Sequence, residues 1–393
     1  MTGVGDVLRQ ARVARRWNQR AVGDLIGYSA SWVSRVENGE ISAPDEVLAT
    51  WCDVLDVPVD RVGLECDDVR RRTVIGLGLG AVAGAAFPVS ASADDSERAI
   101  EAALFSLPDP RPATRAQLAQ RLAAGWDAFH QAHYADVGRT APQLIADALY
   151  ARARDIGARA YVLVAQTAIK NSQPIAWIAA ERARVEAEAT GNPVVMGEAA
   201  HALAITMRHA GEYRAAVDQL NTAAARVNAS VPEENAMRAT LLLTAAYSAA
   251  QAGWGAQALD ALGEAEEAAQ RRMQPVRLHI PGTFGITQTR LFRISVHQAL
   301  GQGEKALHYA GQVDLQELPG AERRGRMCMD VARVWRDLGE PQRCFSALRT
   351  MAQVAPEEVR RPRIKAMTSE LMTLNATIDG LPQFARKIGV AAA

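Results

Sequence analysis

The chain has 393 residues, enough for two or three domains with separate hydrophobic cores. Its 44 Lys and Arg residues balance 44 Asp and Glu residues, so the formal net charge is zero. This balance excludes a general electrostatic attraction to nucleic acid or to an anionic membrane. Aromatic residues make up only 5% of the chain while alanine is abundant, a composition that favours closely packed helices over sheets.

The sequence carries no sign of a metal site, a cofactor site or a catalytic motif. Its four cysteines show neither a CxxC pair nor metal-ligand spacing, which indicates buried thiols in a reducing cytoplasm (Cys52, Cys66, Cys328 and Cys344). No GxSxG, Walker loop or HExxH is present. The run "GLGLGAVAG" has the wrong glycine spacing for a dinucleotide loop. We therefore expect a protein that is not an enzyme and that needs no cofactor or metal.

The first 68 residues predict a domain of five short helices. Apolar residues recur at helical spacing over 6–16. Asn18 is placed to cap a second helix that ends at Ile26, before Gly27. Ser29 would cap a third helix closed by Gly39, a fourth would span roughly 44–55, and Pro58 would begin a fifth. The second and third helices, joined by about three residues that include a glycine, form a helix-turn-helix signature.

The stretch "WNQRAVGDLIGYSASWVSRVENGE" (17–40) resembles the phage Cro/repressor and Xre family of DNA-binding domains. Members of that family share a loose sequence pattern: an NQ or TQ pair, an apolar-alanine turn, G-x-S and then I-S-R-x-E-x-G. The resemblance implies a DNA interface made by Arg16, Gln19, Arg20, Ala30, Ser31, Trp32, Ser34, Arg35 and Asn38. It also implies an internal ion pair between Arg12 and Glu37.

Within this interface the resemblance gives each residue a role. Gln19 would contact a phosphate, and Asn38 would meet the far phosphate backbone. Ala30, Ser31, Ser34 and Arg35 would face base edges in the major groove, where an arginine can bond guanine O6 and N7. Trp32 is bulky for this position, so packing against the protein and contact with DNA both remain open. A local excess of arginine before Val36, including Arg16 and Arg20, would attract phosphates.

Residues 69–110 begin with "VRRRTVIGLGLGAVAGAAFPVSASA", which resembles an export signal, a membrane span or a linker. Export is disfavoured because a complete domain precedes the run. The fifteen apolar residues of 73–87 fall short of the ~20 needed to span a bilayer. Glycines four residues apart (Gly76, Gly80 and Gly84) leave one helix side without side chains. We therefore expect a packed linker helix over 71–86 and a flexible joint over 88–94.

Residues 111–393 predict a helical repeat domain. Helix breaks recur at Gly157, Gly191, Gly211, Gly253, Gly301 and Gly339. Aligned on some of these breaks and on a weaker one at Asn171, a small residue or cysteine follows after five positions (Ala176, Ala216, Ala258, Ala306 and Cys344). This spacing resembles the tetratricopeptide repeat, with an irregular repeat distance of about 38 to 48 residues. A stacked solenoid is favoured, and a non-repeating helical bundle is the alternative.

The first helix of each pair would line the concave face of such a solenoid. Counting back from the breaks places there Tyr161, His201, Ile205, Arg208, Leu243, Tyr247, Gln298 and Met329. This lining, with few charged groups, would suit a peptide or a mostly apolar small molecule as effector. The alternative is that these side chains fill the inside of a tightly wound superhelix.

Together with "TFGITQTRLFRISVHQALGQGEKAL", the two halves resemble actinobacterial Xre-type transcriptional regulators. The resemblance implies an all-α, cytoplasmic, homodimeric regulator that binds a palindromic operator in double-stranded DNA. Its repeat domain would dimerise and bind a peptide or small-molecule effector. Two alternatives remain: a scaffold whose repeats dock a protein partner, and, less favoured, a membrane-tethered sensor that uses residues 70–92 as its anchor.

Overall fold

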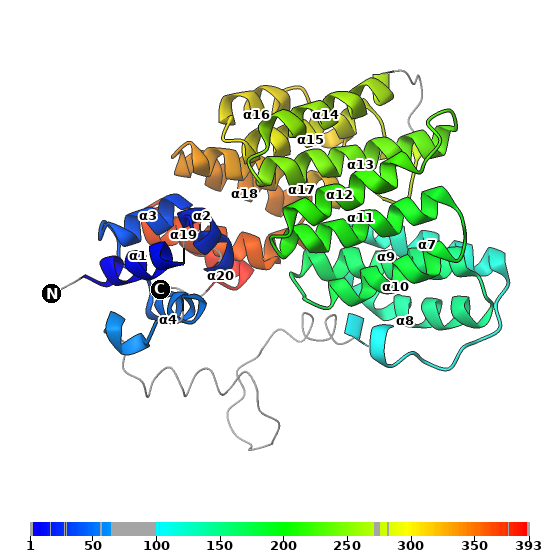
Figure 1. Ribbon diagram of the computed structural model, residues 1–393, viewed down its shortest axis with the longest axis horizontal. Helices are drawn as coiled ribbons and strands as arrows, with labels where there is room; N and C mark the ends of the chain where they lie inside the picture. The colour runs from blue at the N-terminus through cyan, green and yellow to red at the C-terminus, as the bar shows by residue number, and fades with distance from the viewer. Residues whose placement is uncertain are drawn as a thin grey trace, which may run out of the picture. The chain divides into compact units, whose positions relative to one another are not determined.

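The computed structural model describes residues 3–63 except 16, 27, 29 and 56, and residues 100–390 except 102, 271–275, 281–282 and 376. Nearly all regular structure in these residues is helical (Figure 1), which confirms the predicted all-α class. The chain divides into two compact units, one containing 3–63 and the other containing 100–390. The predicted linker helix (71–86), the joint (88–94) and the candidate anchor (70–92) lie outside the described residues.

The N-terminal unit contains the predicted series of short helices. They are α1 (Val4–Ala14), α2 (Gln19–Ile26), α3 (Ala30–Glu37), α4 (Asp45–Val54) and the 3-10 helix η1 (Val59–Val62). The Ala21 N–H donates to Asn18 Oδ1 at 2.8 Å, which confirms the predicted cap of α2. Gly39, with φ of 71°, follows α3 in the left-handed region. The predicted joint residues Gly27 and Ser29 lie outside the described residues.

The core of this unit forms where α1, α3 and α4 meet. Its fully buried side chains include Leu8, Val33, Trp51 and Leu55. Gly5 marks the closest approach of two helices, because a Cβ added there would lie 2.4 Å from the carbonyl oxygen of Val36. Only glycine lets α1 lie this close to the end of α3.

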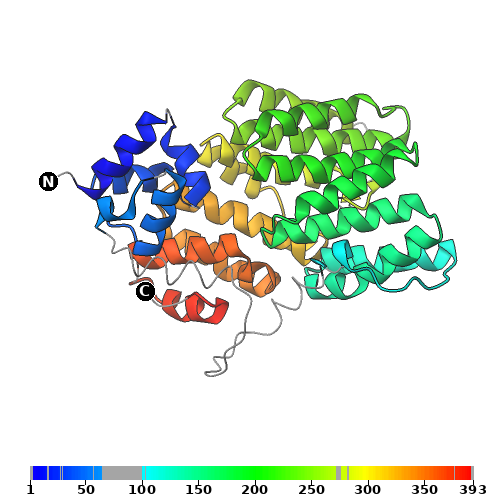
Figure 2. The same ribbon diagram turned by 60° about the horizontal axis from the view of Figure 1, so that its bottom comes forward.

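The C-terminal unit is a series of antiparallel helical pairs. Among the described residues the pairs are α7 (Arg115–His130) with α8 (Tyr134–Tyr150), α9 (Arg154–Lys170) with α10 (Ala176–Glu188), α11 (Pro193–His209) with α12 (Tyr213–Ala225), α13 (Pro232–Gln251) with α14 (Gly255–Gln270), α15 (Ile286–Ala299) with α16 (Gly303–Ala310), α17 (Gly320–Asp337) with α18 (Pro341–Val354), and α19 (Pro362–Asn375) with α20 (Leu381–Ile388). The short 3-10 helices η3 (Leu315–Glu317) and η4 (Glu358–Arg360) lie between pairs. Figures 1 and 2 show successive pairs stacked side by side.

Most of the predicted repeat turns are present. Gly211, Gly253, Gly301 and Gly339 each follow the first helix of a pair, with φ between 72° and 82°. The small residues expected after the breaks are buried in the second helices, where they allow close helix packing (Ala176, Ala216, Ala258, Ala306 and Cys344). The predicted break at Gly157 is wrong, because this residue lies inside α9.

The longest predicted loop, before α15, contains a small departure from the all-helical expectation. Strands β1 (Val276–Arg277) and β2 (Thr283–Phe284) pair there in antiparallel register. Ile280, between the two strands, is 3% exposed and belongs to the main hydrophobic core. The insertion is therefore packed into the unit at this point.

The first helices of the pairs form a closed inner ring. Each of α7, α9, α11, α13, α15 and α17 contacts the next, and α17 contacts α7 again. The junction is tight, because a Cβ added to Gly320 at the start of α17 would lie 2.4 Å from the carbonyl oxygen of His130. The ring surrounds a central space, which the side chains of these helices line.

Candidate functional site

The helix-turn-helix surface presents several of the predicted DNA contacts to solvent. Arg20, Arg35 and Asn38 are exposed. Gln19, Ala30 and Ser34 are half-buried. Arg16 and the side chain of Ser31 lie outside what the structure describes. The exposed polar groups therefore come from both α2 and the end of α3, as the resemblance implies.

Trp32 does not belong to this surface, and its prediction as a DNA contact is wrong. Its side chain is 4% exposed, and its ring stacks on Tyr28 with centroids 3.9 Å apart. It also packs against Trp51, with centroids 6.0 Å apart. A large apolar ring on α3 gains more from burial against its own domain than a polar DNA surface would offer.

The predicted ion pair between Arg12 and Glu37 is confirmed. It is bidentate, with Nε to Oε1 at 2.6 Å and Nη2 to Oε2 at 2.7 Å. The hydrogen bond to Glu37 raises the pKa of the Arg12 guanidinium. Gln19 Nε2 donates to Glu37 Oε2 at 2.9 Å, so the Gln19 amide is engaged within the domain. One buried carboxylate therefore ties α1 and α2 to α3.

Glu40 contacts two of the predicted DNA-binding residues. Its Oε2 lies 3.6 Å from Arg35 Nε, and its Oε1 accepts a hydrogen bond from Asn38 Nδ2 at 3.4 Å. Both members of the Arg35–Glu40 pair are well exposed, so water screens their attraction. The carboxylate nevertheless offsets positive charge at the end of α3.

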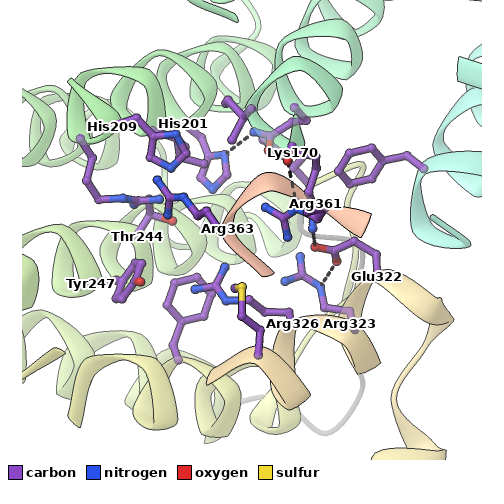
Figure 3. Close-up of a pocket in the computed structure, with 18 of the residues that line it drawn as sticks. Lys170, His201, His209, Thr244, Tyr247, Glu322, Arg323, Arg326, Arg361 and Arg363 are labelled. Atoms are coloured by element: carbon purple, nitrogen blue, oxygen red, sulfur yellow. Dashed lines mark hydrogen bonds and ion pairs between the residues drawn. The ribbon is translucent and has the colours of Figure 1, made fainter. Parts of the chain in front are cut away.

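The second candidate site is a cavity of about 110 Å³ in the helical unit. It lies inside the inner ring, lined by α7, α9, α11, α13, α15 and α17, by the loop between the two strands and by the start of α19. Figure 3 shows the labelled side chains pointing toward this common space. Contributions from helices far apart in sequence meet there.

The structure brings five of the eight predicted concave-face residues to the cavity: His201, Ile205, Arg208, Tyr247 and Met329. The other three do not line it. Leu243 is fully buried in the helix core, and Tyr161 packs beside Arg182. Gln298 Nε2 donates to Asp337 Oδ2 at 2.7 Å. The counting placed these three on the wrong side or too near the end of their helices.

The expected lining with few charged groups is also wrong, because the cavity is strongly basic. Its lining includes Lys170, Arg208, Arg323, Arg326, Arg333, Arg361 and Arg363, together with His130, His201 and His209. The only carboxylate in this lining of described residues is Glu322. Arg323, Arg326 and Arg333 share one face of α17 by helical spacing, a signal available in the sequence. Arg361 and Arg363 follow the last aligned repeat, so counting from the breaks missed them.

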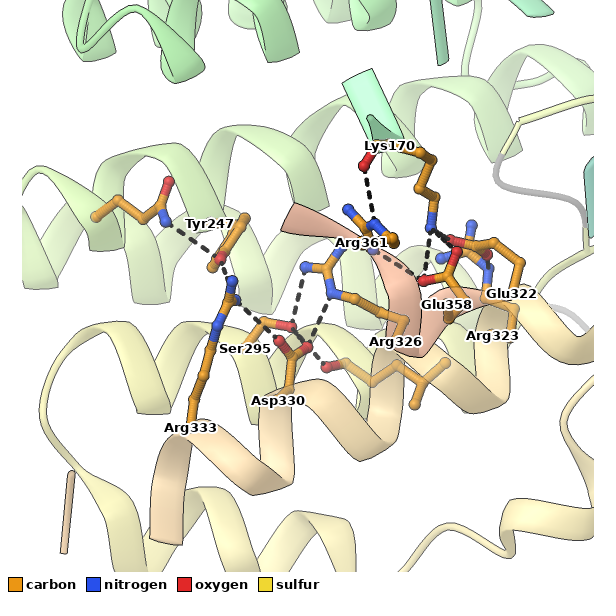
Figure 4. Close-up of polar contacts among 12 residues, drawn as sticks. Lys170, Tyr247, Ser295, Glu322, Arg323, Arg326, Asp330, Arg333, Glu358 and Arg361 are labelled. Atoms are coloured by element: carbon orange, nitrogen blue, oxygen red, sulfur yellow. Dashed lines mark hydrogen bonds and ion pairs between the residues drawn. The ribbon is translucent and has the colours of Figure 1, made fainter. Parts of the chain in front are cut away.

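A buried polar cluster closes the ring beside the cavity (Figure 4). Lys170 Nζ lies 2.5 Å from Glu322 Oε1 and 3.4 Å from Glu358 Oε1. Arg361 Nη1 donates to Glu358 Oε2 at 2.8 Å, and Tyr134 also bonds this carboxylate. Burial lowers the pKa of Lys170, although both carboxylates oppose this. The cluster joins the first helical pairs to the last ones.

A second group of contacts fixes Tyr247 in the cavity wall. Its hydroxyl accepts hydrogen bonds from Gln251 Nε2 at 3.2 Å and from Arg333 Nη1 at 3.5 Å. Asp330 lies 2.9 Å from Arg326 and 3.4 Å from Arg333, which compensates both guanidinium groups. Although burial opposes it, the nearby arginines lower the pKa of Tyr247.

Two cavity residues show the electrostatic effect of this lining. Burial, with the charges of Arg208 and Arg323, lowers the pKa of His201 to about 3, so its imidazole is neutral near pH 7. Burial also lowers the pKa of Arg208 to about 10, with Tyr247 opposing and Arg326 and Arg363 adding to the effect. The cavity therefore disfavours additional positive charge.

The N-terminal unit defines the class of domain. Residues 4–64 match the family described as a helix-turn-helix domain, and α2 and α3 are its paired helices. A search of curated proteins gives no match. The structure aligns with PlcR of Bacillus thuringiensis, which was solved in complex with the peptide PapR7 and DNA. That alignment covers 94% of this chain and 99% of the other, at 10% identity and a TM-score of 0.34.

The described residues contain no group of three or more His, Cys, Asp or Glu side chains that could hold a metal ion. None of the helices in this part of the chain is long and apolar enough to cross a membrane.

Proposed function

We propose that this protein is a sequence-specific DNA-binding transcription regulator of the Xre/Cro type, acting in the cytoplasm. The observation that carries the proposal is the helix-turn-helix domain of residues 4–64, with Arg20, Arg35 and Asn38 exposed on its paired helices. Recognition of this kind places the second helix of the motif in the major groove. Here that helix is α3.

Each exposed group would then have a distinct task. Arg35 would leave Glu40 and bond a guanine edge, a contact worth about 1–3 kcal/mol of discrimination. Arg20 and Asn38 would contact phosphates, which fix the register on DNA without reading sequence. Gln19 would reach a phosphate while its amide keeps α2 tied to Glu37.

The proposed regulator acts as a homodimer on a palindromic operator, with half-sites roughly 34 Å apart. The helical unit would hold the two helix-turn-helix domains of the dimer together and bind a peptide or small-molecule effector in its cavity. Control requires that the effector bind the DNA-competent and incompetent states with different affinities. The cavity inside the inner ring supports this role because it brings together side chains from seven helices.

Mobility shifts test the proposal, using a site selected from random or genomic DNA. We expect salt-sensitive, sequence-dependent retardation by the full chain. Arg35→Ala should relax specificity at one or two base pairs, and Gln19→Ala should weaken binding to every sequence. Arg61→Ala, at an exposed arginine on η1, is the matched control and should change neither. Absence of sequence-dependent retardation would refute the proposal.

A further inference from the structure

Arg208, in the cavity wall, is a buried cation for which the described residues supply no counter-ion. It is 8% exposed, and its Nη1 donates a hydrogen bond to Ser248 Oγ at 3.3 Å. Among the described residues no carboxylate lies within 4.0 Å of its guanidinium. A buried guanidinium that lacks an anionic partner destabilises a fold unless another group compensates it.

Arg363, at the start of α19, shows the same lack of compensation. It lines the cavity and is partly exposed to solvent. No carboxylate in the described part of the chain forms an ion pair with it. The charge of Arg363 adds to the effect of burial in lowering the pKa of Arg208, which indicates that the two guanidinium groups lie near each other.

The other cations of the lining have partners. Lys170 lies between Glu322 and Glu358, and Arg361 pairs with Glu358. Arg326 and Arg333 share Asp330, while Arg323 Nε lies 3.3 Å from Glu322. Among the described residues, Arg208 and Arg363 are therefore the two lysine or arginine side chains of this lining that have no carboxylate partner.

Tyr247 positions one of these guanidinium groups. Arg208 lies over its ring at 4.9 Å from the centroid, and Arg326 lies over the ring at 5.2 Å. The bonds from Gln251 and Arg333 to the Tyr247 hydroxyl hold the ring itself. The donors of Arg208 are thus held in place before any ligand arrives, which reduces the entropic cost of binding.

Apolar side chains complete the wall. Ile205, Phe292 and Met329 line the same cavity as the arginines. A volume of about 110 Å³ suits a single small ring or a short chain rather than a large ligand. A fully apolar molecule would leave the buried guanidinium of Arg208 uncompensated.

We propose that this cavity binds a small organic anion, with a phosphate or carboxylate group between Arg208 and Arg363 and an apolar body against Ile205, Phe292 and Met329. Guanidinium groups bond both kinds of anion through paired N–H donors. That this anion is the effector rests on the proposed regulatory function; its binding does not.

Calorimetry on the full chain, in buffer without phosphate, tests the ligand class with three probes: phenyl phosphate, benzoate and benzyl alcohol. We expect saturable binding of at least one anion, weakened by salt, and at least tenfold weaker binding of the neutral alcohol. The stronger of the two anions identifies the head group. Equal binding of the alcohol would overturn the proposal. So would the absence of binding by either anion at roughly 10 mM, a concentration about tenfold above a millimolar Kd.

Two variants test the assigned residues. Arg208→Gln and Arg363→Gln should each weaken anion binding about tenfold or more. Arg238→Gln is the matched control, since this arginine pairs with Glu264 on the outer side of the ring. Arg208→Gln should also leave the melting temperature of the free protein equal or higher, because it removes an uncompensated buried charge. Unchanged anion affinity in both cavity variants would contradict the assignment.

Measurements without DNA separate this inference from the proposed function. If the anion binds but the chain fails to retard any DNA, the ligand site stands and the regulator proposal fails. If the chain retards its operator but binds neither anion, only the inference about the cavity is wrong.

Discussion

Lys170 on α9 and Glu322 on α17 form a buried ion pair at 2.5 Å across 152 residues of sequence. With Glu358 and Arg361, this pair joins the first helical pairs of the C-terminal unit to the last ones. The solenoid is therefore not an open array in which each pair contacts only its neighbours. It is a closed ring, and its central cavity depends on the closure.

Glu322→Gln should destabilise the ring strongly. The change leaves Lys170 with Glu358 alone and removes the carboxylate beside Arg323, so we expect a loss of about 3 kcal/mol in the free energy of unfolding. Denaturant unfolding of the full chain measures it. Glu264→Gln, which breaks an exposed pair with Arg238, should cost less than about 1 kcal/mol. Equal losses in the two variants would contradict a special role for the closure.

Glu40→Gln should strengthen DNA binding. The substitution frees Arg35 and Asn38 and removes a negative charge from the proposed DNA surface, so we expect roughly three- to tenfold tighter binding at low salt. Titrations against a selected site at two salt concentrations measure the change. Glu340→Gln, at an exposed position of the other unit, is the control. Unaltered or weaker binding by Glu40→Gln would show that the carboxylate does not oppose DNA.

Gly5→Ala should loosen the N-terminal unit. The added Cβ would lie 2.4 Å from the oxygen of Val36 and 2.7 Å from that of Glu37, so α1 must move. Overpacking of this kind costs about 1–3 kcal/mol, which exceeds the helix propensity gained. Hydrogen exchange over residues 4–62 should become faster. Gly263→Ala, where the added Cβ meets nothing within 4 Å, should instead slow exchange in α14.

His201 should make the stability of the protein depend on pH. Its pKa of about 3 lies below the ordinary value of 6.5, so only the unfolded chain binds this proton between these values. Stability therefore falls as the pH drops below about 6.5. From pH 7 to pH 5 we expect the wild-type chain to lose about 2 kcal/mol that His201→Gln retains. Denaturant unfolding in phosphate-free buffer measures the stability of the two chains at each pH. If both chains lose the same stability between pH 7 and pH 5, His201 is not the group responsible.

Local signals predicted much of the fold. The cap at Asn18 and the left-handed Gly39 marked α2 and α3, and the glycine turns marked four of the helical pairs. The first pair was not recognised because Ala132, with φ of 63°, takes the left-handed turn between α7 and α8. Ser172, with φ of 58°, takes the same conformation after α9, where the sequence showed only the weaker break at Asn171. Left-handed backbone at a residue other than glycine is harder to recognise in a sequence.

The cavity was harder to predict because its chemistry depends on ring closure. Arg208 and Tyr247 could be placed by counting along their own helices. Arg361 and Arg363 reach the cavity only because the chain returns to α7 after one circuit of the ring. No sequence period encodes that return. In the N-terminal unit, Trp32 could not be assigned to the core from the sequence because its burial depends on stacking against Tyr28.

The tight junction between Gly320 and His130 also bears on synthesis of the protein. Domains generally fold from the N-terminus while the chain is still being made. The helix-turn-helix domain is complete after about 64 residues, whereas the cavity needs Arg363. A growing chain therefore contains the whole helix-turn-helix domain long before the ring closes around the cavity. If synthesis stops before the last helical pairs, the product would contain the helix-turn-helix domain without the cavity proposed to control it.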